Sequence, residues 1–146
     1  LKCYMADTGL LISHAFDEKQ IVSNELYRKL LLDKLEVNAG MLIENIVAQM
    51  LVAAGHNLYF YSNSDKEEAE NRMEIDFLIR KDNVTSRHNI IPIEAKSSSG
   101  YTTHSLNKCA QKFKGHITLP TVLHPADYKE DTDGKRYLPL YMTPLL

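Results

Sequence analysis

The chain has 146 residues, of which 44% are hydrophobic, and this is enough to bury the core of one ordinary domain without disulfides or a structural metal. We therefore expect a single domain over residues 1–146. The formal net charge of -2 excludes a strongly basic nucleic-acid-binding protein, so any contact with phosphate must come from a local patch.

Three features of the sequence limit the class of protein further. No apolar run approaches the ~20 residues that span a bilayer and no secretory signal peptide is visible, so we expect a cytoplasmic protein with no membrane contact. A GxxxxGK[ST] phosphate-binding loop is missing, which excludes an ATPase site in this chain. The sequence begins at Leu1 rather than Met, and we expect it to be a piece of a longer protein.

The first elements carry no predicted chemistry. Residues 2–5 predict a short strand, and Asp7-Thr8-Gly9 is typical of a turn that leads into an apolar helical turn at residues 10–12. In residues 24–35, leucines at helical spacing alternate with charged side chains, which predicts an amphipathic surface helix.

The clearest helix prediction covers residues 38–54, with Asn38 as N-cap, Gly55 as stop signal and a broad apolar face between them. Glu44 is the only acidic residue of this segment and stands among its apolar residues. A carboxylate beside a core face needs a partner or a metal ion. The alternative is a glutamate on the flank of the helix that turns to solvent.

A short strand is predicted at residues 58–61, followed by a polar, acidic loop. Two longer strands are predicted at residues 73–79 and 91–96, because apolar side chains alternate there with other side chains. The period of two places one set of residues against the helix at 38–54. The members that we expect to be buried there are Ile75, Phe77, Ile91, Ile93 and Ala95.

The other side chains of these two strands form the first candidate site. If the strands pair, the carboxylates of Asp76 and Glu94 meet the ammonium group of Lys96. Mg²⁺ (or Mn²⁺) binds a few carboxylate oxygens and keeps other positions for a phosphate substrate, and a lysine beside it can act on the attacking water or on phosphate charge. The alternative is a solvated Glu-x-Lys pair that contributes ~0.2 to 1 kcal/mol.

The last third of the chain predicts a helix at residues 103–114 and strands at 117–123 and 136–141, with Asp133-Gly134 as a turn before the last strand. Lys108 and Lys112 lie one helical turn apart, in a local basic strip where weak, salt-sensitive binding of DNA is expected. The alternative is a solvated basic face.

Glu44, then Asp76 in EIDF, then Glu94-Ala95-Lys96 in PIEAK resemble the E...D...ExK signature of the PD-(D/E)xK nuclease superfamily. More narrowly, the segments YMADTGLL, LIENIVAQML, LYFYSNS, EIDFLI and IIPIEAKSS resemble the DUF4143 domain, over nearly the whole chain. Two departures are Ile75 in place of a proline before Asp76 and a long loop, KDNVTSRHN, between the two strands.

The resemblance implies the C-terminal domain of a bacterial or archaeal protein whose N-terminal domain is an AAA-type ATPase. It implies a restriction-endonuclease-like α/β fold with a mixed central sheet flanked by helices. It also implies Asp76, Glu94 and Lys96 as catalytic residues. Glu44 would join Asp76 and Glu94 in the metal site, and Lys108, Gln111 or Lys112 would contact nucleic acid.

The sequence therefore leads to two hypotheses. In the first, the domain hydrolyses DNA phosphodiester bonds with Mg²⁺. In the second, it is a non-catalytic module that docks nucleic acid or protein and regulates the attached ATPase. The pattern of residues alone leaves both open, because a fold can host many functions.

Overall fold

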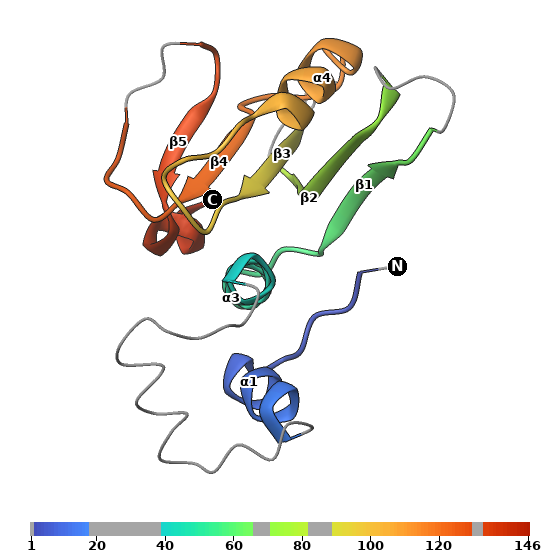
Figure 1. Ribbon diagram of the computed structural model, residues 1–146. Coiled ribbons are helices and arrows are strands. Elements are labelled where there is room, and N and C mark those ends of the chain that lie inside the picture. Colours follow the sequence, from blue (N-terminus) through green and yellow to red (C-terminus); the bar gives the residue numbers. More distant parts are fainter. Residues whose placement is uncertain (1, 18–38, 66–70, 82–88, 130–132) are drawn as a thin grey trace.

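The computed structural model describes residues 2–17, 39–65, 71–81, 89–129 and 133–146 (Figure 1). The predicted helix at residues 24–35, the Asn38 cap and most of the loop between the two long strands lie outside the described residues. The described helices are α1 (Thr8–Asp17), α3 (Ala39–Ala53), α4 (His104–Lys112) and the 3-10 helix η2 (Leu140–Leu145). The described helices include none long and apolar enough to cross a membrane.

The helix boundaries follow from local chemistry. The Asp7 carboxylate accepts a hydrogen bond of 2.9 Å from the Leu10 backbone N–H and so caps the first turn of α1. Gly55 ends α3 with φ of 93°, a conformation that a residue with a Cβ adopts only under strain. The strand predicted at residues 2–5 is instead an extended segment outside the sheet, which we call the N-terminal strap.

Five strands form one mixed sheet in the order β1-β2-β3-β4-β5. Their bounds are β1 (Tyr59–Asn63), β2 (Met73–Arg80), β3 (Ile90–Ala95), β4 (Thr121–His124) and β5 (Arg136–Pro139). The pairs β1–β2 and β2–β3 are antiparallel, whereas β3–β4 and β4–β5 are parallel. Helix α4 provides the crossover between parallel β3 and β4, as this kind of connection requires. The prediction of a mixed sheet flanked by helices is confirmed, and the arrangement is consistent with a nuclease-like α/β fold.

Each face of the sheet buries its own hydrophobic cluster. The cluster on the α3 face consists of Val47, Ala48, Leu51, Phe77, Ile79, Ile91, Ile93, Leu123 and Leu138. The cluster on the α4 face consists of Met73, Ile75, Leu106, Cys109, Val122 and Tyr137. Helix α1 lies beside α3, away from the sheet (Figure 1). Both faces of the sheet therefore contribute to the hydrophobic core.

An irregularity in β2 changes which face its residues meet. The pairing register with β1 shifts between Tyr59 and Tyr61, so that one β1 residue lies opposite both Asp76 and Phe77. An extra residue of this kind is a β-bulge, which reverses the alternation of side chains. Ile75 consequently packs on the α4 face, whereas Phe77 packs on the α3 face.

The sequence prediction placed Ile75 against α3, and this is wrong. Its alternation rule assumed an unbroken strand. The prediction is confirmed for Phe77, Ile91 and Ile93, which are buried on the α3 face, and for Ala95, which packs against the same cluster. The last predicted strand also ends early, because η2 replaces its final residues.

Candidate functional site

Asp76 stands at the bulge in β2, and both of its carboxylate oxygens have a partner. Oδ2 accepts a hydrogen bond of 2.9 Å from the backbone N–H of Ala95, the residue directly after Glu94 on β3. Oδ1 lies 3.0 Å from the Nζ atom of Lys2 in the N-terminal strap. The Asp76 side chain is only 12% exposed. These two contacts hold the carboxylate against the end of the β2–β3 ladder.

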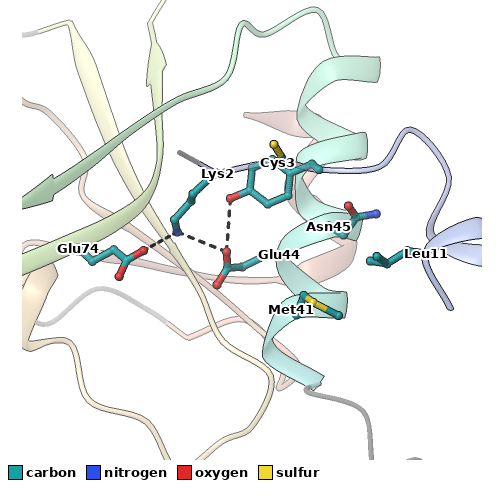
Figure 2. Close-up of a pocket in the computed structure, with 8 residues that line it drawn as sticks. Lys2, Cys3, Leu11, Met41, Glu44, Asn45 and Glu74 are labelled. Carbon is teal, nitrogen blue, oxygen red and sulfur yellow. Dashed lines mark hydrogen bonds and ion pairs between the residues drawn. The ribbon is translucent and has the colours of Figure 1, made fainter. Parts of the chain in front are cut away.

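The ammonium group of Lys2 also reaches two other carboxylates. It lies 3.0 Å from Glu74 Oε1 on β2 and 3.4 Å from Glu44 Oε2 on α3. Figure 2 draws both contacts as dashed lines. We call Lys2, Glu44, Glu74 and Asp76 the Lys2 cluster. Burial lowers the pKa of the Lys2 ammonium, but the charge of Asp76 and the ion pair with Glu74 outweigh that effect and raise it. The ammonium group is therefore fully charged at neutral pH.

Glu44 belongs to this cluster rather than to solvent. Besides the ion pair with Lys2, it accepts a hydrogen bond of 3.3 Å from the Tyr4 hydroxyl. Burial raises the pKa of Glu44, and the negative charge of Asp76 raises it further, while Lys2 acts in the opposite direction. Burial also raises the pKa of Tyr4, so its hydroxyl stays a neutral donor. The solvent-facing alternative for Glu44 is therefore excluded.

Glu94 on β3 and Lys96, the residue directly after this strand, form a second group, the Glu94 pair. Lys96 Nζ lies 3.1 Å from Glu94 Oε1. Within the described part of the chain, the buried Oε2 atom of Glu94 has no hydrogen-bond partner. Burial raises the pKa of Glu94, and the charge of Asp76 adds to the rise, whereas Lys96 lowers it. A buried carboxylate oxygen without a partner is rare, and binding of a ligand or of a proton would stabilise it.

Asp76 connects the two groups. Its Oδ1 atom lies 3.0 Å from Lys2 Nζ, and its Oδ2 atom accepts a hydrogen bond from the backbone N–H of Ala95, the residue after Glu94. The charge of Asp76 also raises the pKa of both Glu44 and Glu94. Yet in the ranges that the structure describes, no three His, Cys, Asp or Glu side chains gather tightly enough to hold one metal ion. The structure brings Asp76, Glu94 and Lys96 to the end of the same strand pair, whereas Glu44 forms an ion pair with Lys2.

A metal ion fits the pair of Asp76 and Glu94 better than the set of three. Mg²⁺ in phosphate-handling sites is commonly held by one or two carboxylates, with substrate phosphates and waters in the other positions. The unpartnered Oε2 atom of Glu94 is the kind of ligand atom that such an ion needs. Glu44 is turned to Lys2 and Tyr4, and it would act on the ion only through the charge of the cluster.

The predicted nucleic-acid-binding residues lie on α4, apart from the carboxylates. Lys108, Gln111 and Lys112 line a surface hollow of about 490 Å³ together with Asn71 and Met73. Lys108 Nζ donates a hydrogen bond of 3.1 Å to the Arg72 backbone carbonyl. This hollow is not lined by Asp76, Glu94 or Lys96.

Sequence reasoning missed Lys2 and Glu74. Lys2 is 74 positions away from Asp76 along the chain, and a lysine in a short extended segment carries no local signal of its role. Glu74 was available from the strand pattern, because it precedes Asp76 by two residues. Glu74 and Asp76 share one face of β2 and both contact the ammonium group of Lys2.

Comparison with known proteins agrees with the family resemblance. A family described as Domain of unknown function (DUF4143) matches residues 39–143, a range that holds Glu44, Asp76, Glu94 and Lys96. No curated protein matches the chain, and no solved structure matches it. The family match covers well over half of the 146 residues. The chain therefore belongs to the DUF4143 family.

Proposed function

We propose that this domain hydrolyses phosphodiester bonds of DNA with Mg²⁺ or Mn²⁺ as cofactor, as the nuclease-like C-terminal part of an AAA-type ATPase. The observation that carries the proposal is the buried Oε2 atom of Glu94, which has no hydrogen-bond partner among the described residues. Lys96 pairs with the other oxygen of this carboxylate, and Asp76 accepts a hydrogen bond from Ala95, the residue between Glu94 and Lys96. Leaving a buried charged oxygen without a partner costs free energy, and a divalent cation removes that cost.

The residues have separate roles in this proposal. Asp76 and Glu94 hold the cation, which when bound stabilises negative charge on the phosphate as a Lewis acid. Lys96, whose ammonium group is 3.1 Å from Glu94, would orient the attacking water or neutralise charge on the phosphate. Lys108, Gln111 and Lys112 on α4 contact the DNA backbone.

The experiment measures nicking and degradation of single-stranded, duplex and branched DNA with Mg²⁺ or Mn²⁺. Asp76→Asn should abolish cleavage and weaken binding of Mn²⁺, because it removes one of two ligand charges. Lys96→Ala should reduce turnover more than metal affinity. Asp127→Asn, at an exposed aspartate outside the site, is the matched control and should keep full activity. Equal cleavage by wild type and Asp76→Asn contradicts the proposal.

The second candidate is a non-catalytic docking module that regulates the attached ATPase. One observation favours it: the Lys2 ammonium group already neutralises part of the charge of Glu44, Glu74 and Asp76. If the wild-type protein binds no Mn²⁺ and cleaves none of the three DNA forms, with or without the ATPase part, the docking module is the better account.

A further inference from the structure

The Lys2 cluster resembles a cation-binding site, with the ammonium group of Lys2 in the place of a bound cation. Three carboxylates from two elements, α3 and β2, surround one ammonium group at 3.0 to 3.4 Å. The Lys2 side chain is 16% exposed, so water contributes little to its solvation. The ion pairs therefore replace most of the hydration of the ammonium group.

The charges of both groups together are unbalanced. Glu44, Glu74, Asp76 and Glu94 supply four negative charges when ionised, and Lys2 and Lys96 supply two positive charges. The remaining charge of -2 would be balanced by one divalent cation.

The ammonium group has a route out of this position. A cavity of about 200 Å³, lined in part by Lys2, Tyr4, Glu44 and Glu74, adjoins it (Figure 2). Since one water molecule takes up roughly 30 Å³ of liquid, this space admits several waters around a displaced lysine head. Met5 donates its backbone N–H to Asn45 Oδ1 at 2.8 Å, so the strap stays attached at its far end while Lys2 moves.

We propose that Lys2 is an exchangeable internal cation, which competes with a divalent cation for the carboxylate of Asp76 and so couples the position of the N-terminal strap to metal loading of the site. The inference rests on the proposed function for the metal site and is independent of whether DNA is cleaved. Without a divalent cation, Lys2 holds Asp76 through Oδ1. A divalent cation at Asp76 would repel the ammonium group, which would release Asp76 and move into the cavity that Glu44 and Glu74 line.

Lys2 influences the affinity for the metal ion in two opposing ways. Lys2 helps to orient Asp76, and its removal would by that route weaken metal binding. The Ala95 N–H also orients Asp76, however, at 2.9 Å, so most of the orientation survives without Lys2. Repulsion between single and double positive charges ~5 Å apart corresponds to about tenfold in affinity even at the dielectric constant of water. The repulsion is therefore the larger of the two effects, and removal of Lys2 should tighten metal binding.

The test measures the affinity for Mn²⁺ by electron paramagnetic resonance at neutral pH. Lys2→Met should bind Mn²⁺ at least about tenfold more tightly than wild type, and Lys2→Gln, which keeps a hydrogen-bond donor without charge, should do the same. Lys2→Arg, which keeps the charge, should remain close to wild type. The exposed Lys81 provides the matched control, and Lys81→Met should not change the affinity. Equal, weaker or undetectable binding by both Lys2→Met and Lys2→Gln overturns the proposal.

A second measurement uses the wild-type protein and needs no variant to fold. The ¹⁵N signal of the Lys2 ammonium group should be sharp without metal, because three ion pairs protect its protons, and should broaden and shift when Mg²⁺ is added. An unchanged signal at saturating Mg²⁺ also overturns the exchange. DNA cleavage is measured separately. If Lys2→Met binds Mn²⁺ more tightly but no protein cleaves DNA, the proposed function is contradicted and the exchange is supported. If the protein cleaves DNA but the affinity for Mn²⁺ is the same in Lys2→Met, the exchange is contradicted and the proposed function is supported.

Discussion

The Lys2 cluster and the Glu94 pair are built from the same two residue types, carboxylate and lysine, yet they differ in how well they are satisfied. In the Lys2 cluster, one ammonium group serves three carboxylates, and the Glu74 side chain is 60% exposed. In the Glu94 pair, one ammonium group serves one carboxylate that is only 8% exposed, and one of its oxygens has no partner among the described residues.

The solvent exposure of a carboxylate therefore decides the free-energy cost of its imperfect pairing more than the number of its ion pairs does. Glu74 can turn to water, and the cost of its imperfect pairing is small. The buried Glu94 carboxylate has no such option, because burial in the sheet removes water from Oε2. In the proposed site an added cation would therefore be needed most at Glu94, and the proposed competition for it would take place at Asp76, which contacts both Lys2 and the backbone N–H of Ala95.

The largest effect is expected from damage to the sheet that both groups share. Ile93 is fully buried on the α3 face beside Phe77, so Ile93→Ala should lower the free energy of unfolding by about 2 to 5 kcal/mol through the cavity that it leaves. Urea denaturation measures the change. Val52→Ala, at a position 57% exposed on α3, is the control and should cost no more than about 0.5 kcal/mol. A cost as small for Ile93→Ala would refute the strand register that positions Glu94.

The second prediction removes the partner of the buried carboxylate. Lys96→Met leaves Glu94 without its ion pair and should lower the free energy of unfolding by about 1 to 3 kcal/mol at neutral pH. Lys2→Met should cost less, since the Glu74 carboxylate can turn to solvent. Thermal and urea denaturation of both variants compares the two groups directly. A larger destabilisation by Lys2→Met than by Lys96→Met contradicts the argument from exposure.

The third prediction concerns the pH dependence that Glu94 gives to stability. Its pKa is raised in the folded state, chiefly by burial, so the folded protein holds the proton more tightly than the unfolded chain does. Stability should therefore fall as the pH rises from the ordinary glutamate pKa through the folded one. Glu94→Gln removes this decrease and should be more stable than wild type at neutral pH, with the difference disappearing in acid.

Denaturation across a pH series measures this effect, without added metal. Glu67→Gln, at a glutamate in the acidic sequence after β1 that lies outside the described residues, serves as a control for a change of one charge. If Glu94→Gln is less stable than wild type at neutral pH, the ion pair with Lys96 outweighs the burial of the carboxylate, and the contrast between the two groups disappears.

The fourth and smallest expected effect tells from which side DNA approaches. Lys108 and Lys112 lie on α4, so the double variant Lys108→Ala, Lys112→Ala should bind DNA more weakly, with a salt slope shallower by up to ~1.8, or ~0.9 for each phosphate that is no longer neutralised. Fluorescence anisotropy over a salt series measures both quantities. Lys81→Ala, at an exposed lysine after β2, is the control. An unchanged slope for the double variant removes α4 from the interface.

Much of the fold was accessible from the sequence because local patterns specify it. Apolar spacing predicted α3 and α4, the glycine at position 55 marked the end of α3, and alternation predicted β2 and β3. The sequence also predicts Asp76, Glu94 and Lys96 as a candidate site, since Glu94 and Lys96 are separated by a single residue and the strand pattern brings Asp76 to the neighbouring strand. These are features of neighbouring residues, which a sequence displays directly.

Only the tertiary structure shows which of these carboxylates pairs with which lysine. The bulge at Asp76 and Phe77 changes the face that β2 presents, and it depends on the register with β1 rather than on any residue in β2 alone. Lys2 reaches Asp76 across 74 positions of sequence because the strap packs along α3, and no local pattern encodes such a contact. The sequence thus determined which carboxylates and lysines are present near the strand ends. The three-dimensional arrangement determined which lysine neutralises which carboxylate, because that depends on distance and burial.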